Sequence, residues 1–111
     1  QKFGIGVRNV WIDTMVAHSV MHPELSHSLA TLTSLYTLHP YYKDMRKETS
    51  ELNYSETAYI YNGLDCCYTY EIAMALYAEM LKTGTEEMFR EIVMPATKTL
   101  VRMEFKGIKV D

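Results

Sequence analysis

The sequence has few of the residues that cross-link small folds. Only two of its 111 residues are cysteine, and these are the adjacent Cys66 and Cys67. Adjacent cysteines cannot join distant segments, and neither a Cys-x-x-Cys motif nor a Cys/His spacing typical of zinc sites is present. The cysteine pattern therefore excludes a disulfide-based or zinc-based scaffold and favours a reducing compartment.

The sequence also lacks a long hydrophobic run and an excess of basic charge. No apolar stretch reaches the roughly 20 residues that span a bilayer, and no signal peptide opens the chain. We therefore expect a soluble, intracellular protein, with cytoplasm, nucleoid, infected host and organelle all left open. The net charge of −3 argues against a general DNA-binding module, but not against a metal-dependent nuclease with clustered carboxylates.

What is present fits one modest folded domain with a limited core. Hydrophobic residues make up 48% of the chain and charged residues 23%, which argues against general disorder. The first residue is glutamine, which indicates a reading frame that begins upstream or a shortened chain.

Residue patterns predict one strand and four helices. The strand is expected over residues 7–13. The helices are expected over 14–22, from Ser26 or Ser28 to Tyr36, from Ser55 to Lys82 and from Thr85 to Lys106, the last with a kink at Pro95. Residues 38–53 lack periodicity and predict an exposed loop. A lone apolar strand cannot satisfy its own backbone groups, so it needs partners from elsewhere.

Tyr61 and Asp65 form the most informative pair of residues. Their spacing places both on one face of a helix, one turn apart, and that face is otherwise apolar. A carboxylate there needs a cation, and its hard oxygens suit Mg²⁺ or Mn²⁺. The neighbouring phenol could hold the water that attacks a phosphate. Alternatively, Asp65 pairs with a basic side chain or a backbone group, and Tyr61 belongs to the core.

Four short motifs follow one another along nearly the whole chain. They are Gly4-Ile5 with Ile12-Asp13-Thr14-Met15, then Ser28-Leu29-Ala30, then Tyr61-x-x-x-Asp65-x-x-x-Thr69, and finally Glu91-Ile92-Val93-Met94-Pro95 with residues 104–111. In this order they resemble the latter part of the proofreading 3′–5′ exonuclease domain of family A DNA polymerases. Each motif alone is a weak signal, whereas four in the right order are strong together.

The resemblance implies a fold class and a division of the chain. The fold class is a mainly α fragment of an α/β, ribonuclease H-like exonuclease domain, with one strand and about four helices. Residues 1–84 would form the C-terminal part of that domain. Residues 85–111 would form a helix that leads to an absent polymerase domain.

The resemblance also implies roles for individual residues. Asp65 would bind a catalytic metal ion, Mg²⁺ or Mn²⁺, and Tyr61 would orient the attacking water, so that a two-metal site releases the 3′-terminal nucleotide of single-stranded DNA. Tyr41, Tyr42 and Lys43 fall near the position where the family contacts that 3′ end. Base stacking and phosphate contact are expected there, with ordinary packing and solvation as the alternative.

The sequence departs from the family at the other metal ligands. It contains no Asp-x-Glu motif and lacks the aspartate of the second motif. Asp13 is assigned a structural role, because the following Thr14-Met15 places it in a later segment. One carboxylate of four remains, so the parent polymerase is expected to be a nuclease, whereas the isolated chain without the missing N-terminal half is expected to be inactive.

Two hypotheses of other classes remain open. The chain could be a small helical interaction module whose tyrosines and methionines form a partner surface. It could also be a truncated protein that forms a homodimer by pairing its strand across a two-fold axis. His18 and His22 lie four residues apart, but no third zinc ligand accompanies them, so they are interpreted as surface or capping histidines.

Overall fold

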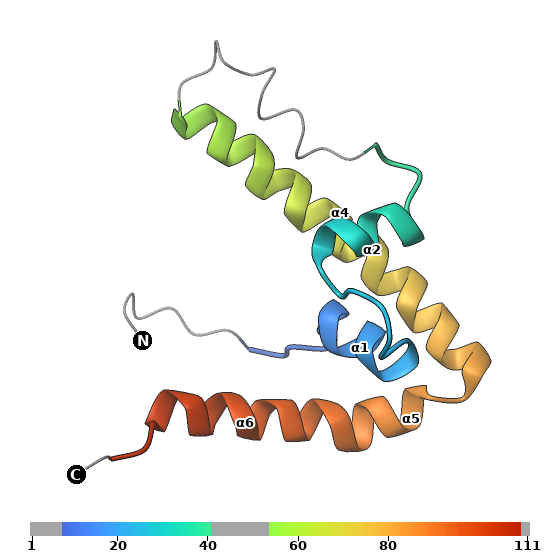
Figure 1. Cartoon of the computed structure of the whole chain (residues 1–111), viewed down its shortest axis with the longest axis vertical. Helices are drawn as coiled ribbons and strands as arrows, with labels where there is room; N and C mark the ends of the chain where they lie inside the picture. The colour runs from blue at the N-terminus through green and yellow to red at the C-terminus, as the bar shows by residue number, and fades with distance from the viewer. Residues whose placement is uncertain (1–7, 41–53, 110–111) are drawn as a thin grey trace.

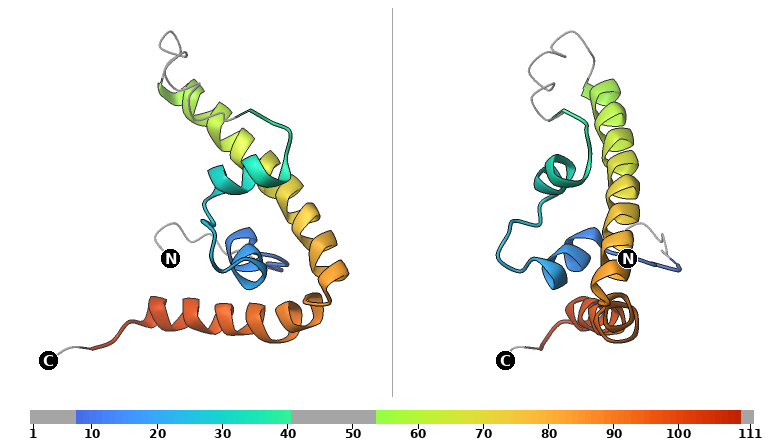
Figure 2. Two further views of the ribbon diagram at one scale, coloured as in Figure 1. Left: turned by 45° about the vertical axis from the view of Figure 1, so that its right-hand side comes forward. Right: turned by 90° about the vertical axis from the view of Figure 1, so that its right-hand side faces the viewer.

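The computed structural model describes residues 8–40 and 54–109, and these residues form helices and their connections. The order of elements is α1 (Thr14–Met21), α2 (Leu29–Tyr36), α4 (Tyr54–Thr83), α5 (Glu86–Met88), η2 (Phe89–Val93) and α6 (Met94–Lys106). Helix α4 is the long central element, and α1 and α2 pack against one side of it (Figure 1). Both views in Figure 2 show α6 leaving the end of α4 in a new direction. The expectation of a mainly helical fold is confirmed.

Local capping interactions determine where the helices begin and end. The Asp13 carboxylate accepts hydrogen bonds from two backbone N–H groups in the first turn of α1, at 3.0 and 3.1 Å. The Ser28 hydroxyl accepts one from the first turn of α2, at 3.2 Å. Gly84 and Gly107 follow α4 and α6 with φ of 72° and 68°, a conformation that favours glycine. Asp13 is therefore a helix cap, which agrees with its assigned structural role.

The helix predicted from Thr85 to Lys106 contains a π-helical segment immediately before the expected kink. In η2 the chain widens, and the backbone N–H of Met94 donates to the carbonyl of Phe89, five residues earlier. Pro95 follows in the first turn of α6. It has no N–H to donate to a carbonyl of the preceding turn, and the wider turn of η2 lies where that hydrogen bond would be missing. The irregularity therefore lies just ahead of the proline.

The strand predicted over residues 7–13 is not found. Residue 7 lies outside the described residues, and residues 8–13 run without regular secondary structure. A strand exists only when a neighbouring strand pairs with it, and no other extended segment pairs with residues 8–13 within the part of the chain that the structure describes. Their β-branched and aromatic composition predicted an extended segment, but not its partner.

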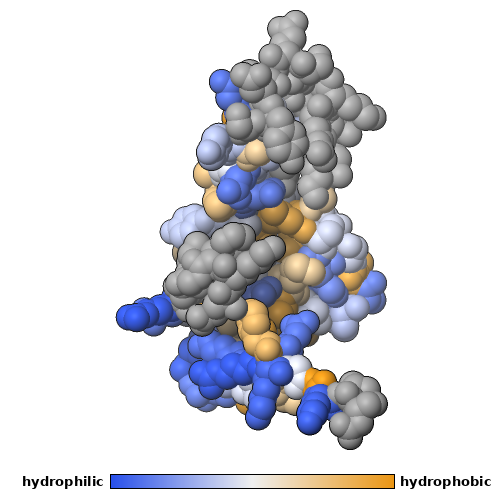
Figure 3. All heavy atoms as spheres, turned by 90° about the vertical axis from the view of Figure 1, so that its left-hand side faces the viewer, coloured by the Kyte–Doolittle hydropathy of each residue, from blue (hydrophilic) through white to orange (hydrophobic). Residues whose placement is uncertain are grey.

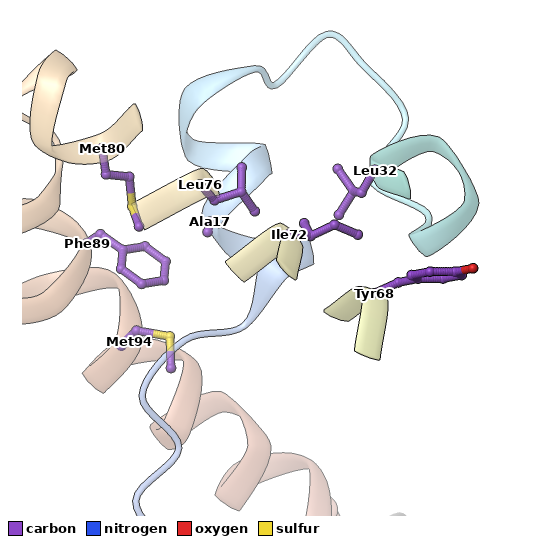
Figure 4. Packing of buried hydrophobic residues seen from close by; sticks show 8 residues of the cluster. All are labelled: Ala17, Leu32, Tyr68, Ile72, Leu76, Met80, Phe89 and Met94. Carbon is purple, nitrogen blue, oxygen red and sulfur yellow. The ribbon is translucent and has the colours of Figure 1, made fainter. Parts of the chain in front are cut away.

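One apolar face of α4 provides most of the core. Tyr68, Ile72, Leu76 and Met80 recur every four residues on this face and are buried. Figure 4 shows how the other elements meet this face, through Ala17 of α1, Leu32 of α2, Phe89 of η2 and Met94 of α6. Burying each large side chain contributes roughly 1.5–3 kcal/mol. The predicted apolar stripe of the long helix is therefore the main packing surface of the described fold.

Apolar side chains remain exposed outside this core. Seen from the side in Figure 3, hydrophobic residues lie open near the middle of the described surface, with hydrophilic residues around them. The far half of α6 also exposes Leu100, Val101, Met103 and Phe105. Among the described helices, none combines the length and the apolar character needed to cross a membrane.

Candidate functional site

Tyr61 and Asp65 lie in the first half of α4, and both are half-buried. Tyr61 packs against the edge of the hydrophobic core, together with Leu64. The partial burial of both residues agrees with the expectation that this face of the helix points toward packing. Their chemical roles stay predictions, because burial alone does not distinguish a catalytic acid from a structural one.

Asp65 lies in the wall of a shallow cavity of about 440 Å³ that is open to solvent, between α4 and the segment that leads into α1. The cavity is lined by Trp11, Ile12, Thr14, Asp65, Cys66, Thr69, Tyr70 and Ala73. Asp65 and Thr69 are thus brought to one cavity by their spacing of four residues on α4. The start of α1, fixed by its Asp13 cap, supplies the opposite wall.

The described residues do not form a metal centre by themselves. Asp65 offers the oxygen ligands that Mg²⁺ and Mn²⁺ prefer. However, no three His, Cys, Asp or Glu side chains within residues 8–40 and 54–109 are placed to hold a metal ion together. A metal bound at Asp65 would therefore need further carboxylates.

The residues expected to contact DNA, Tyr41, Tyr42 and Lys43, lie outside the described residues. Two described side chains near Asp65 carry chemistry that the sequence did not single out. Trp11 and Cys66 both line the cavity, and each is exposed. Only the tertiary contact between residues 11–14 and α4 brings them together, so spacing along the chain gives no signal for this arrangement.

A second group of polar side chains is more closely connected, and we call it the histidine cluster: His18, His22, His27, Tyr36 and Glu79. Nδ1 of His18 lies 2.7 Å from Nδ1 of His27. The carboxylate of Glu79 contacts Nε2 of His22 and accepts a hydrogen bond from the Tyr36 hydroxyl, each at 2.9 Å. Interpreting His18 as a surface or capping residue was wrong, because its side chain is fully buried. His22 does follow the end of α1 as its cap residue.

Burial within the cluster changes its acid–base chemistry. Burial, together with the neighbouring His27 and His22, holds the pKa of His18 below its usual value of 6.5. Burial and the hydrogen bond to Glu79 raise the pKa of Tyr36 to about 12. The spacing of His18 and His22 is visible in the sequence, whereas the contributions of His27, Tyr36 and Glu79 depend on three further segments.

Two comparisons identify relatives of the chain. A family model described as 3′–5′ exonuclease matches residues 1–81. The DNA polymerase I of Synechocystis sp. is 37% identical over 115 aligned residues, which cover 97% of this chain. The chain spans 12% of the length of that polymerase. No solved structure matches the chain.

Proposed function

The chain belongs to the 3′–5′ exonuclease family found in DNA polymerase I, and on this premise we propose that Tyr61 and Asp65 act in proofreading, the removal of a 3′-terminal nucleotide from DNA. The observation that carries the proposal is the position of the Tyr61-x-x-x-Asp65-x-x-x-Thr69 motif within the matched residues. It lies on α4, and Asp65 and Thr69 line one cavity.

In this proposal the carboxylate of Asp65 is a metal ligand, and the hydroxyl of Tyr61 orients the attacking water. Mg²⁺ or Mn²⁺, when bound, would neutralise negative charge on the phosphate. The contribution of the fold is rigidity, because the buried face of α4 includes Tyr68 within the motif and continues through Ile72 and Leu76 directly after it. A side chain held by such packing needs little reorganisation during the reaction.

We further propose that these 111 residues do not hydrolyse DNA by themselves. Asp65 is a single carboxylate, and two dications at one site need several negative oxygens to offset their repulsion. The remaining carboxylates would come from the N-terminal half of the exonuclease domain, with Tyr41, Tyr42 and Lys43 contacting the single-stranded 3′ end. The family match stops at residue 81, close to the end of α4, which supports a division into residues 1–84 and a connecting helix over 85–111.

The test is a single substitution in a polymerase that contains this chain. Asp65→Asn should lower the rate of 3′-nucleotide release from single-stranded DNA by more than about 100-fold, because an amide is a poor substitute for a carboxylate ligand. DNA synthesis should remain unchanged. Glu71→Gln is the matched control, since Glu71 is an exposed acid of the same helix and pairs with His39 instead of facing the cavity. Equal loss of synthesis, or equal loss of hydrolysis in the control, would contradict the role of Asp65.

Self-association is a second candidate, and it is favoured by the exposed side chains of residues 8–13. Val10 and Trp11 are 43% and 50% exposed in a segment without a strand partner among the described residues. Such a segment can pair with the same segment of a second copy across a two-fold axis. Light scattering tests this directly, with a dimer expected from pairing and a strict monomer at high concentration excluding it.

A further inference from the structure

The histidine cluster joins four segments of the fold that are separate in the sequence. His18 comes from α1 and His22 is the residue that caps its end, His27 comes from the connection between α1 and α2, Tyr36 from α2 and Glu79 from α4. Three aromatic rings surround the buried ring of His18, with centroid distances of 5.2 Å to His22, 5.0 Å to His27 and 5.8 Å to Tyr36. Its Nε2 atom is buried and finds no hydrogen-bond partner among the residues that the structure describes. The ring is therefore poorly placed to carry a positive charge.

The contact between His18 and His27 limits how many protons the two rings can hold. At 2.7 Å between their Nδ1 atoms, one nitrogen must carry a hydrogen and the other must offer a lone pair. Two neutral rings of opposite tautomer satisfy this requirement, and so does one neutral ring with one charged ring. Two charged rings do not, because both Nδ1 atoms would then carry hydrogen and the two positive charges would repel.

The acidic residues near the cluster do not make it possible for His18 and His27 to be charged at the same time while their Nδ1 atoms stay in contact. Burial disfavours the charged form of Glu79, but hydrogen bonds from His22 and Tyr36 outweigh it and hold the pKa of Glu79 below its usual value of 4.5. Glu79 thus stays ionised at mildly acidic pH, with His22 and Tyr36 as its direct partners. Glu24 is the other acid that acts on His18, and its effect is smaller. Glu79 accepts a hydrogen from Nε2 of His22, so their contact is compatible with hydrogen on that nitrogen, unlike the contact between the two Nδ1 atoms of His18 and His27.

We propose that the contact between His18 and His27 is an acid-sensitive clasp that closes the connection between α1 and α2, and that it opens when both rings become charged. His27 directly precedes Ser28, the cap of α2, so opening releases the start of α2 from α1. The bond between His22 and Glu79 holds the end of α1 on α4 throughout. The expected change is local loosening of residues 23–32, including the hydrogen bond from the N–H of Leu32 to the Ser28 carbonyl, and not global unfolding.

The direction of the pH dependence follows from His18. Its pKa is lower in the folded chain than the usual 6.5, so the unfolded or opened form binds the proton more readily. The stabilisation is complete above pH 6.5 and is lost as the pH falls from 6.5 through the folded pKa. Each pH unit in that interval should lower the protection of the affected amides by up to about tenfold.

Amide hydrogen exchange of the full chain, followed by NMR between pH 7.5 and 5 and corrected for intrinsic rates, tests the clasp. The reporter is the N–H of Leu32, which donates to the Ser28 carbonyl at 2.9 Å in the first turn of α2. Its protection should fall in the original chain and stay constant in His27→Asn, which places an uncharged polar atom near the Nδ1 position. His39→Asn changes an exposed histidine that pairs with Glu71, and it should behave like the original chain.

Two results would overturn the proposal: constant protection of Leu32 in the original chain, or an equal fall in His27→Asn. If His27→Asn does not fold, nitrogen-15 spectra of the imidazoles in the original chain at pH 7.5 decide the question. One of His18 and His27 should carry its proton on Nδ1, and the other on Nε2. Protons on Nε2 of both rings would show that the two Nδ1 atoms share no hydrogen bond.

Discussion

At the scale of single residues, Tyr61 has two separable parts. Its ring packs against the hydrophobic core, while its hydroxyl is the group proposed to orient water. Tyr61→Phe keeps the ring, so the free energy of unfolding should change by less than about 1 kcal/mol. In a polymerase that contains this chain, hydrolysis should slow, but less than in Asp65→Asn, because the metal ligand remains. Nucleotide release and thermal unfolding measure the two effects, and an unchanged rate would remove the hydroxyl from the mechanism.

Substitution of Tyr36 measures how much the histidine cluster contributes to the free energy of unfolding. Its hydroxyl donates to Glu79 at 2.9 Å, and this bond helps to keep the pKa of that carboxyl low. Glu79 thus contributes stability above pH 4.5 that is lost as the pH falls through its folded pKa. Tyr36→Phe should lower stability by about 1 kcal/mol at pH 7 and move the midpoint of acid unfolding to higher pH. Urea unfolding across pH checks both, with Tyr59→Phe as the exposed control; equal effects in the two variants would exclude a specific bond.

At the scale of elements, replacing Gly63 and replacing Gly84 with alanine should change the stability of the chain in opposite directions. A Cβ added at either glycine meets no atom within 4 Å, so neither position is sterically restricted by its neighbours. Gly63 lies inside α4, whereas Gly84 follows α4 with a φ of 72°. Gly63→Ala should therefore stabilise the chain by about 0.5–1 kcal/mol, and Gly84→Ala should destabilise it by about 1 kcal/mol. Denaturant unfolding distinguishes them, and destabilisation by Gly63→Ala would indicate a contact that the helix alone does not explain.

The elements that could be predicted from the sequence are those fixed by neighbouring residues. Asp13, Ser28 and Gly84 end or begin helices through contacts within a few residues, and the apolar spacing from Tyr68 to Met80 identifies the buried face of α4. The strand over residues 7–13 was wrong for the described residues because strand formation depends on a distant partner. The burial of His18 was missed for the same reason, since residues of α1, α2 and α4 enclose it only after folding.

At the scale of the whole molecule, the described fold is one long helix with its neighbours on one side. Helices α1 and α2 cover part of α4, and the chain turns after α4 so that α5, η2 and α6 run on as one continuous helix beneath α1 (Figures 1 and 2). The candidate site was partly predictable, because Tyr61 and Asp65 share a helix and a motif. The opposite wall of the cavity, with Trp11 and Thr14, could not be predicted from the sequence, because it depends on how the segment before α1 lies against α4.

The attachment of the final helix to this body depends on Phe89. Its ring is buried between Met80 of α4 and Met94 of α6, in the helix that follows the turn after α4 (Figure 4). Phe89→Ala should lower the free energy of unfolding by about 3–5 kcal/mol, because it removes a buried ring and leaves a cavity. Phe105→Ala is the matched control, since Phe105 is 79% exposed near the end of α6, and it should change stability by less than about 0.5 kcal/mol. Urea unfolding followed by the fluorescence of Trp11 measures both variants. Similar small losses would mean that Phe89 does not anchor η2 and α6 to the body that carries Asp65.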